Sequence, residues 1–268
     1  MLKKQQKILL CRLLDEFKKR VIYLKNYKIT AQYDGTKYNG WQKQGNTKNT
    51  IQHKFEDVVQ KMCGTNVEIN ASGRTDAGVH ALCQVANFKC SVDMTSQEIM
   101  DYINKYLPED ILVTSVCVAD DRFHARLNAV SKTYQYTIAT QKPDVFIRKY
   151  VYKTDSVPDV SKMKKASKMF LGTHDFKGFC SDKTKKSTVR TINFIDVEHN
   201  NGIIKIIVNG SGFLYNMVRI IAGTLLDIGL GKLNESIIEE VFKTKDRSKG
   251  GTTLPAKGLI LKEVLYEK

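Results

Sequence analysis

Strand and helix patterns alternate along this chain in an order that restricts its fold more than any other feature. Residues 27–33 alternate apolar and polar side chains, which is typical of a half-buried strand. Asn49 or Thr50 then caps a helix with apolar side chains at helical spacing, and Gly64 ends it. The first round of elements is a strand at 27–33, a helix at 51–62, strands at 67–71 and 84–89, a helix at 96–107 and a strand at 111–119. The order β-α-β-β-α-β predicts a ferredoxin-like sandwich.

A second round of alternating elements follows the first. It consists of a strand at 132–140, a helix at 160–170, a hairpin of 188–197 and 203–208, helices at 213–228 and 234–242, and a strand at 259–266. The turn Asn200-Asn201-Gly202 is a strong hairpin signal. We therefore predict the α/β (α+β) class, with two ferredoxin-like or RRM-like sandwich halves whose mainly antiparallel sheets join side by side around a central cleft. No sequence repeat relates the halves, so the duplication is inferred from the order of elements.

These patterns divide the chain into three segments. Residues 1–26 are lysine-rich and amphipathic, and we expect an N-terminal extension that is either helical or disordered. Residues 27–124 are predicted to form an N-terminal α/β domain, and 125–268 a C-terminal α/β domain that completes the active site. The 268 residues are enough to bury a sizeable core.

The composition is strongly basic. The 43 Lys and Arg residues exceed the 28 Asp and Glu residues and give a net charge of +15, which favours a nucleic acid as partner. Basic clusters at 162–165, 183–186 and 243–249 are candidate phosphate contacts, although a solvated helix face is the default for each. No apolar run approaches the roughly 20 residues of a membrane span. The six cysteines form no C-x-x-C pair, which predicts reduced thiols in a cytoplasmic protein.

The loop at 71–81 is the strongest candidate site. It places Arg74, Asp76 and His80 among glycines and alanines, which keep bulk away from the carboxylate. Asp76 is compatible with a nucleophile, a general base, a metal ligand or a structural carboxylate. No further side chains nearby complete a metal shell, so we predict no metal site. No second carboxylate stands out, which weakens a glycosidase-type hydrolase.

Arg219 is the second candidate. It ends the apolar run of residues 213–218, where an isolated buried charge is costly. Asp76 is a possible partner that would keep both groups charged. A surface arginine whose stem covers a core helix explains the pattern equally well.

Several ordered blocks of this sequence resemble the tRNA pseudouridine synthase A family. The block Gly73-Arg74-Thr75-Asp76-Ala77-Gly78-Val79-His80 is similar to its catalytic signature. The other matching blocks are 33–42 (YDGTKYNGWQ), 123–126 (FHAR), 132–136 (KTYQY), 213–219 (FLYNMVR) and 254–259 (LPAKGL). Two departures are visible: Cys83 stands where the family usually has glycine, and residues 1–26 have no counterpart.

The resemblance implies isomerisation of uridine to pseudouridine without a cofactor, metal or second substrate. Asp76 would be the nucleophile, and Arg219 would pair with it. Tyr134 would pack on the uracil and is a candidate base for the later proton transfer, although a core tyrosine fits strand alternation as well. Leu259 would line the base pocket. The route, through C1′, through uracil C6 or through a glycal, stays open.

The remaining candidates would contact RNA. Arg74 would occupy or brace the space left by a flipped uridine, the alternative being a plain phosphate contact. Lys37, Trp41 and Gln42 lie on a loop that would touch RNA, although core packing is equally compatible with Trp41. We expect His80 to hold the loop by hydrogen bonds rather than to titrate in catalysis.

By the same resemblance, the substrate would be the anticodon arm of tRNA at positions 38–40, bound by a homodimer. Recognition by shape would suit a target whose neighbouring bases vary. Ribosomal RNA as the substrate and a non-catalytic RNA-binding protein remain alternatives. A methyltransferase is disfavoured, because no glycine-rich cofactor loop follows the first strand.

Overall fold

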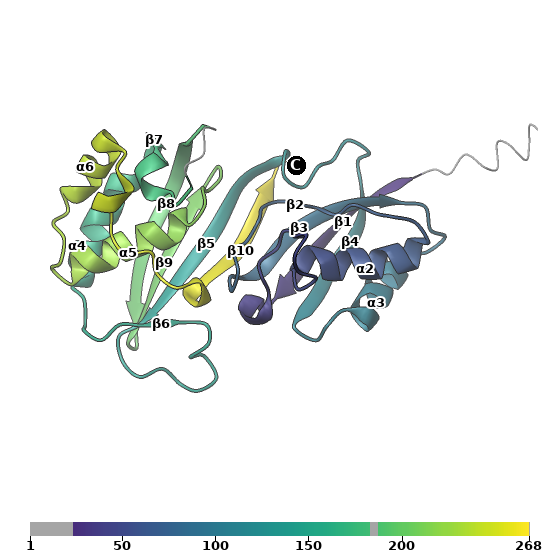
Figure 1. Ribbon diagram of the computed structural model, residues 1–268, viewed down its shortest axis with the longest axis horizontal. Coiled ribbons are helices and arrows are strands. Elements are labelled where there is room, and N and C mark those ends of the chain that lie inside the picture. The colour runs from purple at the N-terminus through teal and green to yellow at the C-terminus, as the bar shows by residue number, and fades with distance from the viewer. Residues whose placement is uncertain (1–23, 183–186, 268) are drawn as a thin grey trace, which may run out of the picture.

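One continuous sheet organises the protein, and its helices pack against it (Figure 1). The computed structural model describes residues 24–182 and 187–267. The strand order in the ten-stranded sheet is β4-β1-β3-β10-β5-β9-β8-β7, while β2 pairs with β3 and β6 with β5. Residues 1–23 of the expected extension and the basic cluster at 183–186 lie outside the described residues. Within the described ranges, no helix is both long enough and apolar enough to cross a membrane.

The first half has the predicted ferredoxin-like topology. Its elements are β1 (Lys25–Tyr33), η1 (Gly35–Lys37), α2 (Ile51–Cys63), β2 (Asn70–Ala71), β3 (His80–Cys90), α3 (Ser96–Tyr106) and β4 (Ile111–Ala119). The order β4-β1-β3-β2 is antiparallel throughout. Two expectations were wrong. The strand expected at 67–71 is only two residues long, because β10 occupies the other end of the β3 edge. Residues 25 and 26 belong to β1 rather than to the extension.

The second half repeats this topology with two added strands, β7 at the sheet edge and the short β6 beside β5. Its elements are β5 (Ala129–Ala139), β6 (Tyr152–Lys153), α4 (Val160–Ser167), η2 (Lys168–Phe170), β7 (Gly172–Asp175), η3 (Phe176–Phe179), β8 (Val189–Asn200), β9 (Ile203–Gly210), α5 (Met217–Gly229), α6 (Ile237–Thr244), η4 (Arg247–Lys249), η5 (Ala256–Gly258) and β10 (Leu259–Tyr266). Strands β10-β5-β9-β8 are antiparallel, and β7 extends the edge. The predicted hairpin between β8 and β9 is present. Helix α5 begins later than expected, because Asn216 before it has a positive φ of 61°.

The two halves meet where β3 and β10 pair in parallel. His80 lies opposite Ile260, and Ala81 opposite Leu261. The buried apolar side chains of both halves form one core cluster. Figure 1 shows β10 and β5 at the middle of the molecule, beside β3. The loop that precedes β3 and carries Asp76 is therefore brought next to the second half.

Candidate active site

The backbone around Asp76 is fixed by the segment that follows β1. Trp41 N donates to Thr75 O at 2.9 Å, and Gly78 N donates to Tyr38 O at 3.3 Å. Gly40 has a φ of 87°, and a Cβ there would lie 2.7 Å from Thr75 O. This close approach requires glycine, since neither the dihedral nor the space suits another residue. Residues 38–41 thus hold the loop that presents the carboxylate.

A buried network of hydrogen bonds also holds the same loop in place. The hydroxyls of Thr75 and Tyr33 lie 2.8 Å apart. Gln84 donates through Nε2 to Gly73 O at 2.9 Å and accepts from Ser72 Oγ at 2.7 Å. Because Ser72 and Gln84 are fully buried, each hydrogen bond avoids an unsatisfied polar group.

Asp76 faces Arg219 across the junction of the two halves. Asp76 Oδ2 lies 3.8 Å from Arg219 Nη1. The guanidinium is oriented by Leu254 O, 2.7 Å from Nε, and by Asn216 Oδ1, 2.5 Å from Nη1. Burial raises the pKa of the Asp76 carboxyl, and the positive charge of Arg219 opposes that shift. The Arg219 side chain is only 16% exposed, so it is the paired arginine and not the surface one.

Tyr134 on β5 lines the pocket in front of Asp76. Its side chain is 7% exposed, and its ring meets Phe213 edge-on at 5.2 Å. Burial raises the pKa of the Tyr134 hydroxyl, and the nearby Tyr33 and Asp76 raise it further. The hydroxyl is therefore a neutral phenol at neutral pH, which favours packing on a base over proton abstraction.

A pocket of about 650 Å³ contains the carboxylate and most of the predicted site. Of the predicted residues, it is lined by Trp41, Gln42, Arg74, Asp76, Tyr134 and Leu259. Leu259 is the first residue of β10 and is 6% exposed. Arg219 pairs with Asp76 without belonging to the lining. The structure thus brings together side chains that lie far apart in the sequence.

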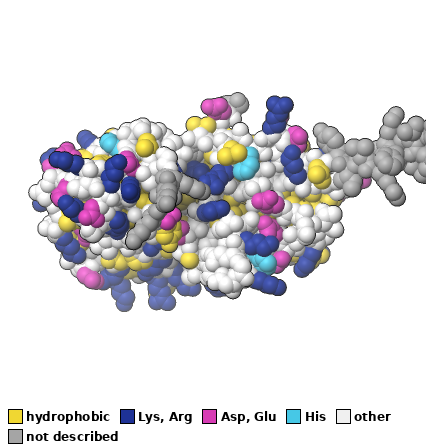
Figure 2. Space-filling view, turned by 45° about the horizontal axis from the view of Figure 1, so that its top comes forward, with side chains coloured by type: hydrophobic (Ala, Val, Ile, Leu, Met, Phe, Trp, Pro, Cys, Tyr) yellow, Lys and Arg dark blue, Asp and Glu magenta, His cyan; other side chains and the backbone are white. Residues whose placement is uncertain are grey.

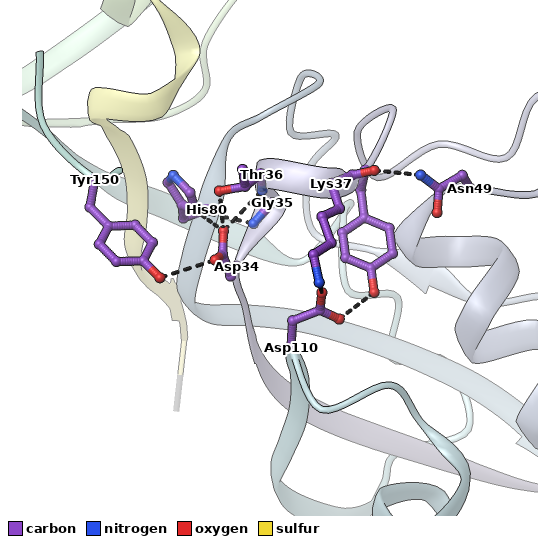
Figure 3. A network of polar contacts seen from close by, with 9 residues as sticks. Asp34, Gly35, Thr36, Lys37, Asn49, His80, Asp110 and Tyr150 are labelled. Carbon is purple, nitrogen blue, oxygen red and sulfur yellow. Dashed lines mark hydrogen bonds and ion pairs between the residues drawn. The ribbon is translucent and has the colours of Figure 1, made fainter. Parts of the chain in front are cut away.

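Trp41 and Lys37, which we predicted to contact RNA, are not both exposed in the pocket. Trp41 is 1% exposed and packs between Tyr33 and Phe55, which favours its alternative as a core residue. Lys37 lies outside the pocket lining, with an 81% exposed side chain 3.7 Å from Asp110 (Figure 3). Any RNA contact by Lys37 would therefore lie outside the pocket that contains Asp76.

His80 is held in a polar network behind the loop. Its Nδ1 accepts from Gly35 N at 3.1 Å and lies 3.0 Å from Asp34 Oδ1. Tyr150, from the second half, points toward Asp34 and donates to Oδ2 at 3.0 Å (Figure 3). Burial lowers the pKa of His80 more than Asp34 raises it, so the imidazole is neutral at neutral pH. The hydrogen bond from Gly35 N to Nδ1 is compatible with a role of His80 in holding the loop, and that role stays a prediction.

Sequence reasoning assigned no role to three cations that line the pocket. They are Arg126, Lys132 and Arg190. Arg126 and Lys132 lie inside sequence blocks that carry the family resemblance, but no local pattern showed that they meet near Asp76. Cys83 is half-buried in β3 and packs against the core. Within residues 24–182 and 187–267, no group of three or more His, Cys, Asp and Glu side chains is placed to hold a metal ion.

Comparisons with known proteins give a consistent result. A family model described as tRNA pseudouridine synthase matches residues 29–128 and 166–267, which include Asp76 and Arg219. The chain is 47% identical to a tRNA pseudouridine synthase A of Bacillus sp. (strain KSM-64) over 91% of its own length and 100% of that protein. It is 46% identical to tRNA pseudouridine synthase A 1 of Clostridium tetani, again over 91% and 100%. A tRNA pseudouridine synthase A 2 of Clostridium perfringens is 47% identical with the same coverage.

Proposed function

Because this chain belongs to the tRNA pseudouridine synthase family, we propose that it isomerises uridine to pseudouridine in tRNA, with Asp76 as the nucleophile. The observation that best supports this proposal is the half-buried carboxylate of Asp76. It lies in a pocket, and its Oδ2 is 3.8 Å from Nη1 of Arg219. Burial makes the carboxylate poorly solvated and hence reactive, while the charge of Arg219 favours its ionised form. The intact carboxylate and its partner argue against a non-catalytic RNA-binding protein.

The reaction balances without any added reagent. The bond between uracil N1 and C1′ breaks, the uracil turns, and a bond forms between C5 and C1′. The proton on C5 is lost and N1 gains one, so substrate and product are isomers. Attack by Asp76 on C1′, attack on uracil C6 and a glycal route all begin with the ionised carboxylate beside the sugar and base.

The other pocket residues would hold the flipped nucleotide. Tyr134 and Leu259 present apolar surface on which the uracil would pack. Arg74 is exposed at the pocket wall two residues before Asp76, where it would occupy the space that the uridine leaves. Unstacking a base costs a few kcal/mol, so a group that fills the gap lowers the cost of flipping.

The proposal extends to the substrate and the assembly. The target would be uridines 38–40 in the anticodon arm of tRNA, bound by a homodimer in the cytoplasm. The names of the matched relatives support tRNA as the substrate. Ribosomal RNA is the alternative target, and it is tested in the same experiment.

The test compares the wild-type protein with Asp76→Ala on tRNA and ribosomal RNA transcripts, with pseudouridine mapped by carbodiimide labelling. We expect modification at positions 38–40 of tRNA by the wild type and none by Asp76→Ala. Glu198→Ala is the matched control and should retain wild-type activity, because Glu198 is an exposed carboxylate on β8 outside the pocket lining. Full activity of Asp76→Ala, or no product from the wild type, would rule the proposal out.

A further inference from the structure

Three cationic side chains form one wall of the pocket. Arg126, Lys132 and Arg190 line it together with Asp76, and none of the three forms an ion pair within the ranges that the structure describes. In the basic clusters at 162–165 and 243–249, several lysines are paired: Lys165 with Glu235, Lys245 with Asp175 and Lys249 with Glu240. Lys and Arg side chains also gather near the middle of the face in Figure 2.

Lys132 connects this wall to the catalytic loop. It lies on β5, and its Nζ donates to Ser72 O at 2.6 Å. Gly73 passes so close that a Cβ there would lie 3.3 Å from the same nitrogen. Burial lowers the pKa of Lys132 to about 8, and the neighbouring Arg126 and Arg190 contribute to that shift. The ammonium group thus lies among like charges, with one backbone carbonyl as its partner in the described chain.

The hydrogen bonds described for the two arginines involve no carboxylate. Arg190 Nη1 donates to Val189 O at 2.6 Å and to Ser187 O at 3.1 Å. The backbone N–H of Arg126 donates to His124 Nδ1 at 3.1 Å, which fixes the turn that carries it. Backbone carbonyls orient the Arg190 guanidinium without neutralising its charge, and the contact with His124 fixes the backbone of Arg126. A cluster of like charges around a half-buried amine is unfavourable unless an anion binds there.

We infer that Arg126, Lys132 and Arg190 form a binding site for one backbone phosphate of the RNA beside the target uridine. This inference rests on the proposed function for the identity of the anion. A phosphodiester fits the site because guanidinium and ammonium groups are the side chains that recognise phosphate. Lys132 would bind the phosphate while holding Ser72 O, so that docking of the backbone also positions the loop with Asp76. Lys132 is in this respect a positioning residue.

The test neutralises one phosphate at a time. RNA stem-loops carry a single methylphosphonate linkage at successive positions around the target uridine, and their affinity is measured at constant salt. For the wild type, we expect one linkage to weaken binding about tenfold to a hundredfold. Lys132→Met, Arg126→Ala and Arg190→Ala should bind the unmodified RNA more weakly and no longer respond to that linkage. Lys164→Ala, an exposed lysine on α4 outside the pocket, should respond as the wild type does.

A kinetic comparison separates the role of Lys132 from those of the arginines. Lys132→Met should lower kcat as well as affinity, whereas Arg126→Ala and Arg190→Ala should lower affinity alone. Equal responses of wild type and all three variants at every linkage would overturn the phosphate site. Because affinity is measured directly, a linkage-specific loss without any pseudouridine would retain the site and reject the proposed function. The two arginine variants keep the test valid should Lys132→Met fail to fold.

Discussion

At the scale of single residues, Asp76 lies where its negative charge is energetically unfavourable. Burial disfavours the charged form of Asp76, and Arg219 recovers only part of that loss, since its nitrogen stays 3.8 Å away. Such a carboxylate is poorly solvated and therefore more reactive than an exposed one. The same feature makes the folded protein less stable than a chain with a neutral group at this position.

Replacing Asp76 with a neutral isostere is expected to stabilise the protein. The folded-state pKa of Asp76 is raised above its usual value of 3.8, so the folded form binds this proton more tightly than the unfolded form. The stability that the folded state gains from this tighter proton binding is complete below the unfolded-state pKa. It is lost as the pH rises through the folded-state pKa. Asp76→Asn should therefore be about 1 kcal/mol more stable than wild type at pH 7. Thermal unfolding should show this gain disappear toward pH 4, and a gain that persists at low pH would contradict the argument.

Arg219→Leu should impair catalysis in a pH-dependent way. Without the guanidinium, the pKa of Asp76 rises further, and the fraction of the carboxylate that is ionised at a given acidic pH falls. We expect kcat to fall about a hundredfold, RNA affinity to change little, and the acid limb of kcat/KM to move to higher pH. Arg219→Lys, which keeps the charge, should move the limb back toward its wild-type position. Normal turnover of Arg219→Leu would remove this residue from the site.

At the scale of elements, local sequence patterns predicted the helices and strands whose bounds depend on nearby residues. The apolar spacing of α2, with Thr50 at its start and Gly64 at its end, is present as expected. The start of α5 was misplaced, because Asn216 takes a left-handed conformation and turns its oxygen toward Arg219. That contact has no signature in the run of apolar letters around it. The shortness of β2 was equally hidden, since it depends on where β10 pairs.

Gly40→Ala tests whether the segment after β1 positions the catalytic loop. An added Cβ would lie 2.7 Å from Thr75 O, and the φ of 87° is strained for alanine. We expect a loss of about 2–3 kcal/mol in stability and at least a tenfold fall in kcat. Gly64→Ala is the matched control: its φ of 66° is also left-handed, but nothing lies within 4 Å of the added atom. That variant should lose about 1 kcal/mol and keep full kcat. Equal kcat values for the two variants would contradict a positioning role.

At the scale of the whole molecule, the proposed active site depends on the two halves sharing one sheet. Asp76 belongs to the first half, while Tyr134, Lys132 and Arg219 belong to the second. The sequence suggested that Asp76, Tyr134 and Arg219 meet, through the resemblance and through the improbable charge in an apolar run. It did not reveal Lys132, because a contact over 60 residues of chain leaves no periodic trace.

A single cooperative unfolding transition is expected despite the two sandwich halves. The buried apolar residues form one cluster that includes Leu261 at the junction and side chains of both halves. Trp41, the one tryptophan of the chain, is buried in the first half, so its fluorescence reports that half alone. In urea, the fluorescence and far-UV circular dichroism midpoints should coincide. A fluorescence transition separated from the dichroism transition would show that the halves unfold independently.

The position of β10 has a consequence for the order in which the protein is made. This strand follows every other strand in the described chain, yet it lies between β3 and β5. Translation delivers the earlier elements first, so the nascent polypeptide holds Asp76 and Tyr134 with an open gap between their strands. The two residues acquire a common framework only when residues 259–266 leave the ribosome and close that gap. We therefore expect the proposed site to be complete only after β10 has paired with both β3 and β5.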